Sequence, residues 1–223
     1  MMLSLRKISI SLWILLGLSS STWGLSVGEL TYFMGSDTAF LARKVFNDTQ
    51  QARFYDVSVE ESDPPYGNAV ERKAPAGELL YAPKQLLLRP NSSDWLKLYY
   101  RGPQDDHPRY YRITFRERPG ALVPRGDTPR FTTSIRLSTI LVVQPRKARQ
   151  SYTFENGSVL NSGNTVYLAY LEGRCNVEPS ISLPCVREKY LAPGERLLLQ
   201  GWFPTEDTRL FMSNEQTKSV QWE

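Results

Sequence analysis

The residues that could carry chemistry are few and scattered. The chain has one histidine, His107, in a loop rich in proline and aspartate, and two cysteines, Cys175 and Cys185. A general base must be held by an orienting partner, and the neighbours of His107 predict an ordinary solvated side chain. A secreted enzyme that uses His107 stays an alternative, which an activity test of His107→Ala decides. The composition favours a protein that is not an enzyme.

The sequence also contains no motif typical of a cofactor or metal site. No glycine-rich phosphate loop, HExxH or paired-cysteine zinc motif occurs. Adjacent acids at Asp105 and Asp106 lack the further spaced ligands that calcium needs. With one histidine, a two-cysteine metal site has few further ligands and is the weaker interpretation. We therefore expect no cofactor and no metal.

The N-terminus indicates export. Arg6 and Lys7 precede the short apolar run Ile8–Leu18, which small polar residues follow. This order predicts a secretory signal peptide over residues 1–24, because the run is short for a membrane helix. An uncleaved anchor is the alternative. In an oxidising compartment, an even count of cysteines predicts a Cys175–Cys185 disulfide.

Charge and composition narrow the class. The net charge of +4 falls to +2 without Arg6 and Lys7, too weak and too evenly spread for nucleic acid. Fifteen prolines, fourteen glycines and many short runs of β-forming residues predict an all-β chain. The polar segment that starts at Pro145 is the expected linker, giving domains at 25–145 and 146–223.

The longest run of β-forming residues, Phe131–Arg146, organises the rest of the chain. Its first half alternates, and its second half, Ile140–Val143, is apolar on both faces, so one end is expected to be buried and the other half exposed. An open apolar strand edge seeks pairing. The strand is therefore either a central strand of a sandwich or an element that binds another chain.

Other segments predict how the first domain is built. Ala39–Phe46 and Ala52–Glu60 are expected to form a hairpin around the turn that contains Asn47. Leu79–Leu88 is interrupted by Pro83, which favours an edge strand or a crossing between sheets.

Four segments, in order, carry a family resemblance: VFNDTQQARFYDVSVEE, LLYAPKQLLLRPNSSDWLKLYYRG, YYRITFRERP and ILVVQP. Together they resemble the first domain of periplasmic pilus chaperones of the chaperone–usher pathway, closest to the divergent common-pilus and CFA/I-like branch. The resemblance implies two immunoglobulin-like β-sandwiches arranged as an L. It also implies a periplasmic protein that lends a strand to pilin subunits and delivers them to an outer-membrane usher. A secreted adhesion or binding module, or a pilus subunit, is the alternative.

The resemblance also assigns residues. The groove-filling side chains of the donor strand correspond to Phe131, Thr133, Ile135 and Leu137, and Glu117 matches a buried acid between the domains. The family's carboxylate-gripping lysine falls at Ile140, beside Thr139, and Leu25–Ala42 lacks its arginine, which leaves Arg43, Arg136 and Thr139 as candidates. Gln144 stands where the family's interdomain cluster usually has an arginine. Without a client, the strand is expected to be exposed or covered by self-association.

Overall fold

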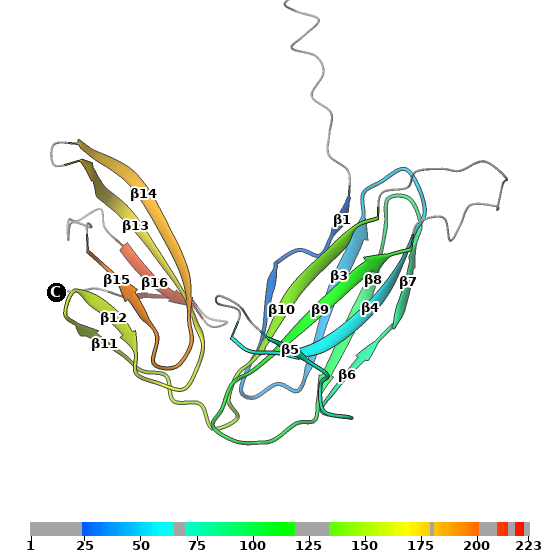
Figure 1. Ribbon diagram of the computed structural model, residues 1–223, viewed down its shortest axis with the longest axis horizontal. Helices are drawn as coiled ribbons and strands as arrows, with labels where there is room; N and C mark the ends of the chain where they lie inside the picture. Colours follow the sequence, from blue (N-terminus) through cyan, green and yellow to red (C-terminus); the bar gives the residue numbers. More distant parts are fainter. Residues whose placement is uncertain are drawn as a thin grey trace, which may run out of the picture.

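The computed structural model describes residues 24–64, 70–118, 134–178, 181–200, 209–213 and 217–220, without the side chains of 175–178, 181–183 and 217–220. Throughout these ranges the regular secondary structure is β-strand, arranged as two sandwiches that meet at one end (Figure 1). No helix in them is long and apolar enough to span a membrane. The expected signal peptide lies outside the described residues.

Two sheets, in which most neighbouring strands run antiparallel, form the N-terminal sandwich (Figure 1). The first sheet has the order β1-β3-β8-β6, with β1 (Leu25–Ser26), β3 (Phe40–Asn47), β8 (Ser92–Tyr100) and β6 (Leu79–Ala82). The second has the order β2-β10-β9-β4-β5, with β7 also paired to β4; its strands are β2 (Thr31–Met34), β10 (Arg136–Val143), β9 (Arg109–Glu117), β4 (Arg53–Ser62), β5 (Glu71–Arg72) and β7 (Gln85–Leu88).

Alternating apolar side chains of both sheets meet in one core. Its fully buried members include Tyr32, Tyr55, Tyr111, Phe115 and Leu141. The large aromatic side chains account for much of the apolar surface that folding removes from water. This packing leaves the edges of the sheets, rather than their inner faces, available for pairing with another chain.

The segment before β2 changes sheets. β1 pairs antiparallel with β3, and β2 pairs parallel with β10 in the other sheet. Gly28, between them, has a φ of 75°, a conformation that glycine adopts without a Cβ clash. As a result, neither β3 nor β10 is covered along its whole length by the N-terminal segment.

Two expectations about connections have opposite outcomes. The hairpin of Ala39–Phe46 with Ala52–Glu60 is wrong: β3 pairs with β8, whereas β4 pairs with β9 in the other sheet. The turn after Asn47 therefore links the two layers instead of joining neighbouring strands. The crossing at Pro83 is confirmed, because β6 pairs with β8 in one sheet and β7 with β4 in the other.

The C-terminal sandwich is smaller. One sheet has the order β11-β12-β15, with β11 (Tyr152–Glu155), β12 (Ser158–Asn161) and β15 (Arg196–Leu198). The other has the order β14-β13-β16-β17, with β14 (Ile181–Leu191), β13 (Tyr167–Glu178), β16 (Arg209–Ser213) and β17 (Thr217–Val220). A separate core around Leu171, Leu191 and Leu210 lies between these sheets.

Candidate functional site: an open strand edge beside the interdomain groove

β10 is paired on both sides along only half of its length. On one side β9 follows it from Arg136 to Val143, and on the other β2 covers Ile140–Val143. Along Arg136–Thr139 no second strand is present among the described residues. The organising strand of the sequence is thus a central strand at one end and an edge strand at the other.

Hydrogen bonds fix which residues of β10 face the open side. Glu117 donates its backbone N–H to the carbonyl of Ile135 (2.8 Å), so odd-numbered residues exchange backbone hydrogen bonds with β9. The backbone N–H and C=O groups of even-numbered residues point to the other side of β10. For example, the N–H of Ile140 donates to the carbonyl of Leu30 (2.9 Å). At Arg136 and Ser138 the same outward N–H and C=O groups face an edge that no described strand covers.

Burial along β10 follows the expected gradient. Ile135 is 40% exposed, whereas Ile140–Val143 are all buried. Leu141 and Val143 enter the N-terminal core, and Ile140 and Val142 pack on the opposite face with Val166 of the C-terminal domain. The expectation of a strand that is buried at one end and half exposed at the other is confirmed.

The predicted groove-filling residues are only partly placed. Phe131 and Thr133 lie outside the described residues. Ile135 lies directly before β10, with an exposed side chain. Leu137 is half-buried and packs against the N-terminal core, so only part of its side chain is free for a client. The assignment of these four residues to client binding stays a prediction.

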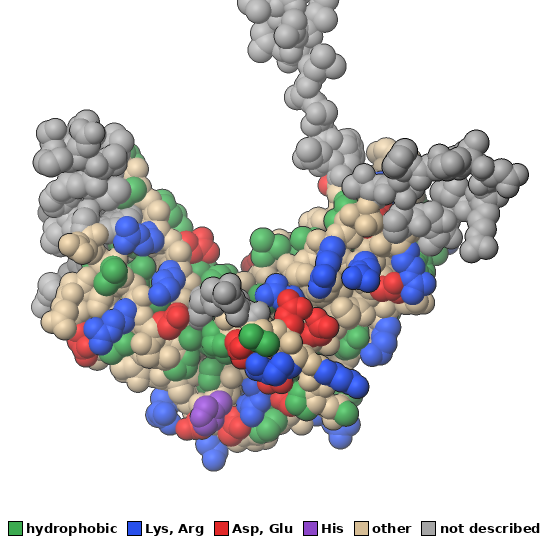
Figure 2. Space-filling view, in the orientation of Figure 1, with side chains coloured by type: hydrophobic (Ala, Val, Ile, Leu, Met, Phe, Trp, Pro, Cys, Tyr) green, Lys and Arg blue, Asp and Glu red, His purple; other side chains and the backbone are tan. Residues whose placement is uncertain are grey.

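The edge of β10 lies next to a groove between the domains, visible as the notch in Figure 2. The groove has a volume of about 810 Å³ and is lined by β2 and β3 on one side and by β13, β14 and β16 on the other. Apolar side chains rim it: Leu30 is 63% and Phe40 53% exposed, and the rings of Phe33 and Tyr190 lie 6.1 Å apart across the domains. Such a groove suits an apolar partner segment.

The three candidate carboxylate anchors occupy different environments. The Arg43 guanidinium lines the groove, 5.2 Å from the centre of the Tyr32 ring, and burial raises the pKa of that tyrosine. Arg136 is exposed at the open edge of β10. Thr139 is 1% exposed, which leaves no surface for a client's carboxylate in this conformation. Arg43 is therefore the candidate that both faces the groove and carries charge.

Glu117 does not lie between the domains, and that expectation is wrong. β9 begins at Arg109 beside the linker and ends at Glu117, so the strand carries Glu117 to the far end of the sandwich. There its carboxylate binds Arg53 (2.5 Å) and the backbone N–H of Ile135 (3.1 Å). The sequence pattern placed Glu117 correctly at the end of a strand but did not show which end adjoins the linker.

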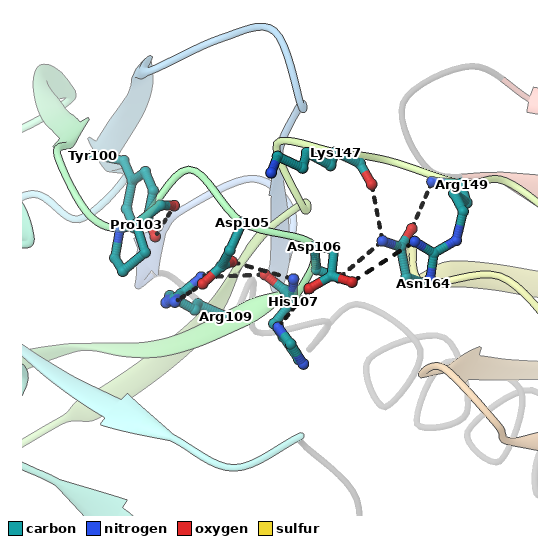
Figure 3. A network of polar contacts seen from close by, with 9 residues as sticks. All are labelled: Tyr100, Pro103, Asp105, Asp106, His107, Arg109, Lys147, Arg149 and Asn164. Carbon is teal, nitrogen blue, oxygen red and sulfur yellow. Dashed lines mark hydrogen bonds and ion pairs between the residues drawn. The ribbon is translucent and has the colours of Figure 1, made fainter.

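Two neutral amides join the domains instead: Gln144, already noted in the sequence, and Asn164, which no sequence pattern indicated. The buried Gln144 side chain donates to the carbonyl of Val166 (2.8 Å) and accepts from its N–H (2.9 Å). Asn164 donates to the carbonyls of Asp106 (2.8 Å) and Lys147 (2.9 Å) (Figure 3).

His107 lies on the surface of the same junction. Its ring nitrogen Nδ1 is 2.8 Å from Asp106, and its side chain is 78% exposed. Asp105 bonds to Arg109 through two contacts (2.8 and 2.7 Å), which lower the pKa of Asp105 (Figure 3). The loop that carries His107 contacts the C-terminal domain through Asp106, and the exposed His107 side chain lies on the surface rather than in a cavity.

Comparisons with known proteins decide the family. A family model described as the EcpB C-terminal domain matches residues 150–209. The probable fimbrial chaperone EcpB of Klebsiella pneumoniae is 32% identical over 195 residues, which cover 86% of this chain and 87% of that protein. The chain belongs to the fimbrial chaperone family.

Further relatives agree. The probable fimbrial chaperone EcpE of Escherichia coli O157:H7 is 36% identical over 161 residues, covering 70% of this chain and 68% of that protein. Solved structures share the fold of this fimbrial chaperone: CfaA, a class 5 fimbriae chaperone, with a TM-score of 0.54 at 12% identity, and the Escherichia coli chaperone DraB, with 0.52 at 14%. They cover 88% and 91% of this chain and 98% of each neighbour. The expected pair of immunoglobulin-like domains is confirmed.

The disulfide concerns the outer part of the C-terminal domain of this fimbrial chaperone. Cys185 on β14 is disulfide-bonded, and the chain has one other cysteine, Cys175 on the paired strand β13. The side chain of Cys175 is not among the described ones, so the Cys175–Cys185 pairing stays a prediction.

Proposed function

We propose that this fimbrial chaperone acts in the periplasm, where it binds pilin subunits by adding the open edge of β10 to their sheet and delivers them to an outer-membrane usher. One observation carries the proposal: β10 has a strand on both sides along Ile140–Val143 and on one side only along Arg136–Thr139. Unpaired strand edges are templates for another chain. In β-augmentation, backbone hydrogen bonds supply affinity, and alternate side chains in pockets supply register.

The surroundings of the edge support a pilin as the client. Ile135 offers an exposed apolar side chain at the start of the strand, and the groove beside β10 offers Leu30 and Phe40. Arg43 in that groove would provide the positive charge for a carboxylate. A solved chain from a chaperone–tip adhesin complex of CFA/I fimbriae shares the fold (TM-score 0.51, 13% identity).

The alternative of an adhesion module or pilus subunit predicts a different architecture. A subunit that needs a donated strand is a single incomplete sandwich, whereas this chain forms two sandwiches with separate cores. The chaperone is the function that the geometry supports best.

The test is co-expression in periplasm with the fimbrial subunits of the same organism, followed by recovery of the chaperone–subunit complex. Ile135→Glu should abolish recovery, because a charge would enter an apolar pocket of the client. The matched control is Leu87→Glu, an equally apolar side chain that is 54% exposed on β7, at the opposite edge of the sheet.

Circular dichroism should show both variants folded, since both side chains face solvent in the free protein. Normal subunit recovery by folded Ile135→Glu would overturn the donor role of β10. Equal losses in Ile135→Glu and Leu87→Glu would point to a general effect of added negative charge and would also count against it.

A further inference from the structure

Glu117 is a buried carboxylate of the N-terminal domain whose two oxygens are both hydrogen-bonded. Its side chain is 3% exposed, and each oxygen has a different partner. Oε1 accepts from Nη1 of Arg53 (2.5 Å), and Oε2 accepts from the backbone N–H of Ile135 (3.1 Å). A buried charge is tolerated when it is paired and hydrogen-bonded in this way.

Glu117 also grips Ile135 through the backbone. Its own N–H donates to the carbonyl of Ile135 (2.8 Å), one residue before β10 begins. In a regular antiparallel pair, the N–H of Ile135 would reach the carbonyl of Glu117. Here a side chain takes that place, so the last rung between β9 and the start of β10 depends on one carboxylate.

The outgoing chain is held at the same place. Arg118 donates its backbone N–H to the carbonyl of Phe54 (2.9 Å), and its guanidinium pairs with Asp56 on β4. Arg53, the partner of Glu117, is also on β4. Both ends of the connection from β9 to β10 are therefore fixed against the same pair of strands.

We infer that Glu117 and Arg53 form a latch that sets the phase of the client-binding edge, so that Arg136 and Ser138 present their backbone groups outward. A strand that slips by one residue turns every side chain to the opposite face. Holding Ile135 by both N–H and C=O prevents that slip where no second strand assists. The two residues are positioning residues that act through β10, and the inference rests on the proposed function.

Hydrogen exchange of the free mature protein, with its disulfide intact, tests the latch without any client. Glu117→Ala should speed exchange of the Ile135 amide about tenfold or more, while Leu141 and Val143, held between two strands, keep their protection. Glu117→Gln should preserve most of the protection, because its amide oxygen can still accept from Ile135. Arg53→Met, which removes the charge partner alone, should give an intermediate rate.

The matched control is Glu78→Gln, which removes a carboxylate that pairs with Arg109 (3.1 Å) and accepts from Tyr111 (2.7 Å) elsewhere in the domain. It should lower the melting temperature without changing exchange at Ile135 or subunit affinity. Subunit affinity should fall about tenfold in Glu117→Ala and recover in Glu117→Gln. Unchanged exchange at Ile135 in Glu117→Ala would overturn the latch.

The two proposals fail in distinguishable ways. In one outcome, the wild type recovers no subunit while the Glu117 and Arg53 variants still show the exchange pattern described. That result would contradict client binding by β10, and the latch would then serve only the structure of the chaperone itself. Normal subunit recovery together with an Ile135 amide indifferent to Glu117 would sink the latch alone. If Glu117→Ala does not fold, Glu117→Gln and Arg53→Met still compare the two halves of the latch.

Discussion

Gln144 and Val166 exchange two hydrogen bonds across the domain boundary, from Nε2 to the carbonyl (2.8 Å) and from the N–H to Oε1 (2.9 Å). The side chain thus imitates one rung of a β-ladder between the end of β10 and the C-terminal domain. Because the amide is neutral, this contact keeps its strength across the pH and salt ranges in which a surface ion pair weakens.

Gln144→Ala should loosen the angle between the domains. It leaves the N–H and C=O of Val166 buried without partners, at about 1–3 kcal/mol for each group. We expect a broader range of interdomain distances in small-angle scattering and a lower subunit affinity. The control is Gln85→Ala, which removes an exposed amide bonded to Asp56 (3.1 Å) and should leave both readouts unchanged. An unaltered scattering profile for Gln144→Ala would show that the apolar contacts around Val166 are enough to hold the angle between the domains.

The sequence predicted those features of the fold that depend on a few neighbouring residues, namely strand burial and the change of sheet at Pro83. Ile140–Val143 is apolar at every position, and the structure buries one face in the core and the other at the junction with Val166. Pro83 interrupts an apolar run, and the chain changes sheets there. These features follow from side-chain alternation and from the missing N–H of proline.

Long-range partners could not be read from the same patterns. Nothing in residues 31–34 announces a parallel pairing with β10, and that pairing decides where the open edge begins. The position of Glu117 relative to the linker depends on the direction of β9 in the sheet, which alternation leaves unspecified. The pairing of Arg53 with Glu117 could not be predicted either, because an isolated arginine on a strand is usually solvated.

Loss of the disulfide should weaken the C-terminal domain. If Cys175 pairs with Cys185, closing so short a loop contributes about 2.5–3 kcal/mol in the chain-entropy model. Cys185→Ser should lower the urea midpoint of this domain by a corresponding amount, with the N-terminal transition unchanged. Two free thiols per molecule in protein isolated from periplasm would contradict the pairing.

Acid should weaken the loop at the junction through Asp105. The hydrogen bonds from Arg109 hold the pKa of Asp105 below its usual range, so the folded state favours the carboxylate more than the unfolded state does. The resulting stabilisation is present above the unfolded pKa of about 3.9 and is lost as the pH falls further. Asp105→Asn should melt below the wild type at pH 7, and the difference should shrink toward pH 2. A difference that stays constant over that range would exclude the ion pair as its source.

Two substitutions at Arg136 separate its backbone from its charge. Arg136 is the first residue of β10, is exposed, and directs its N–H toward the open edge. Arg136→Ser keeps that N–H and removes the guanidinium, whereas Arg136→Pro removes both; proline is tolerated at the first residue of a strand. If the edge pairs with a client, Arg136→Pro should bind subunits about tenfold more weakly than Arg136→Ser, because one buried backbone carbonyl of the client loses its donor.

Arg136→Ser on its own reports on the carboxylate anchor. A small effect would leave Arg43 in the groove as the anchor, and a loss clearly larger than that of Arg43→Ser would assign the carboxylate contact to Arg136. The control for proline is Thr139→Pro, in which the missing N–H belongs to the ladder with β9, so the fold itself should be destabilised. Equal subunit affinities for folded Arg136→Pro and Arg136→Ser would mean that the client does not pair with the backbone at this position, and the register derived for the edge would be wrong.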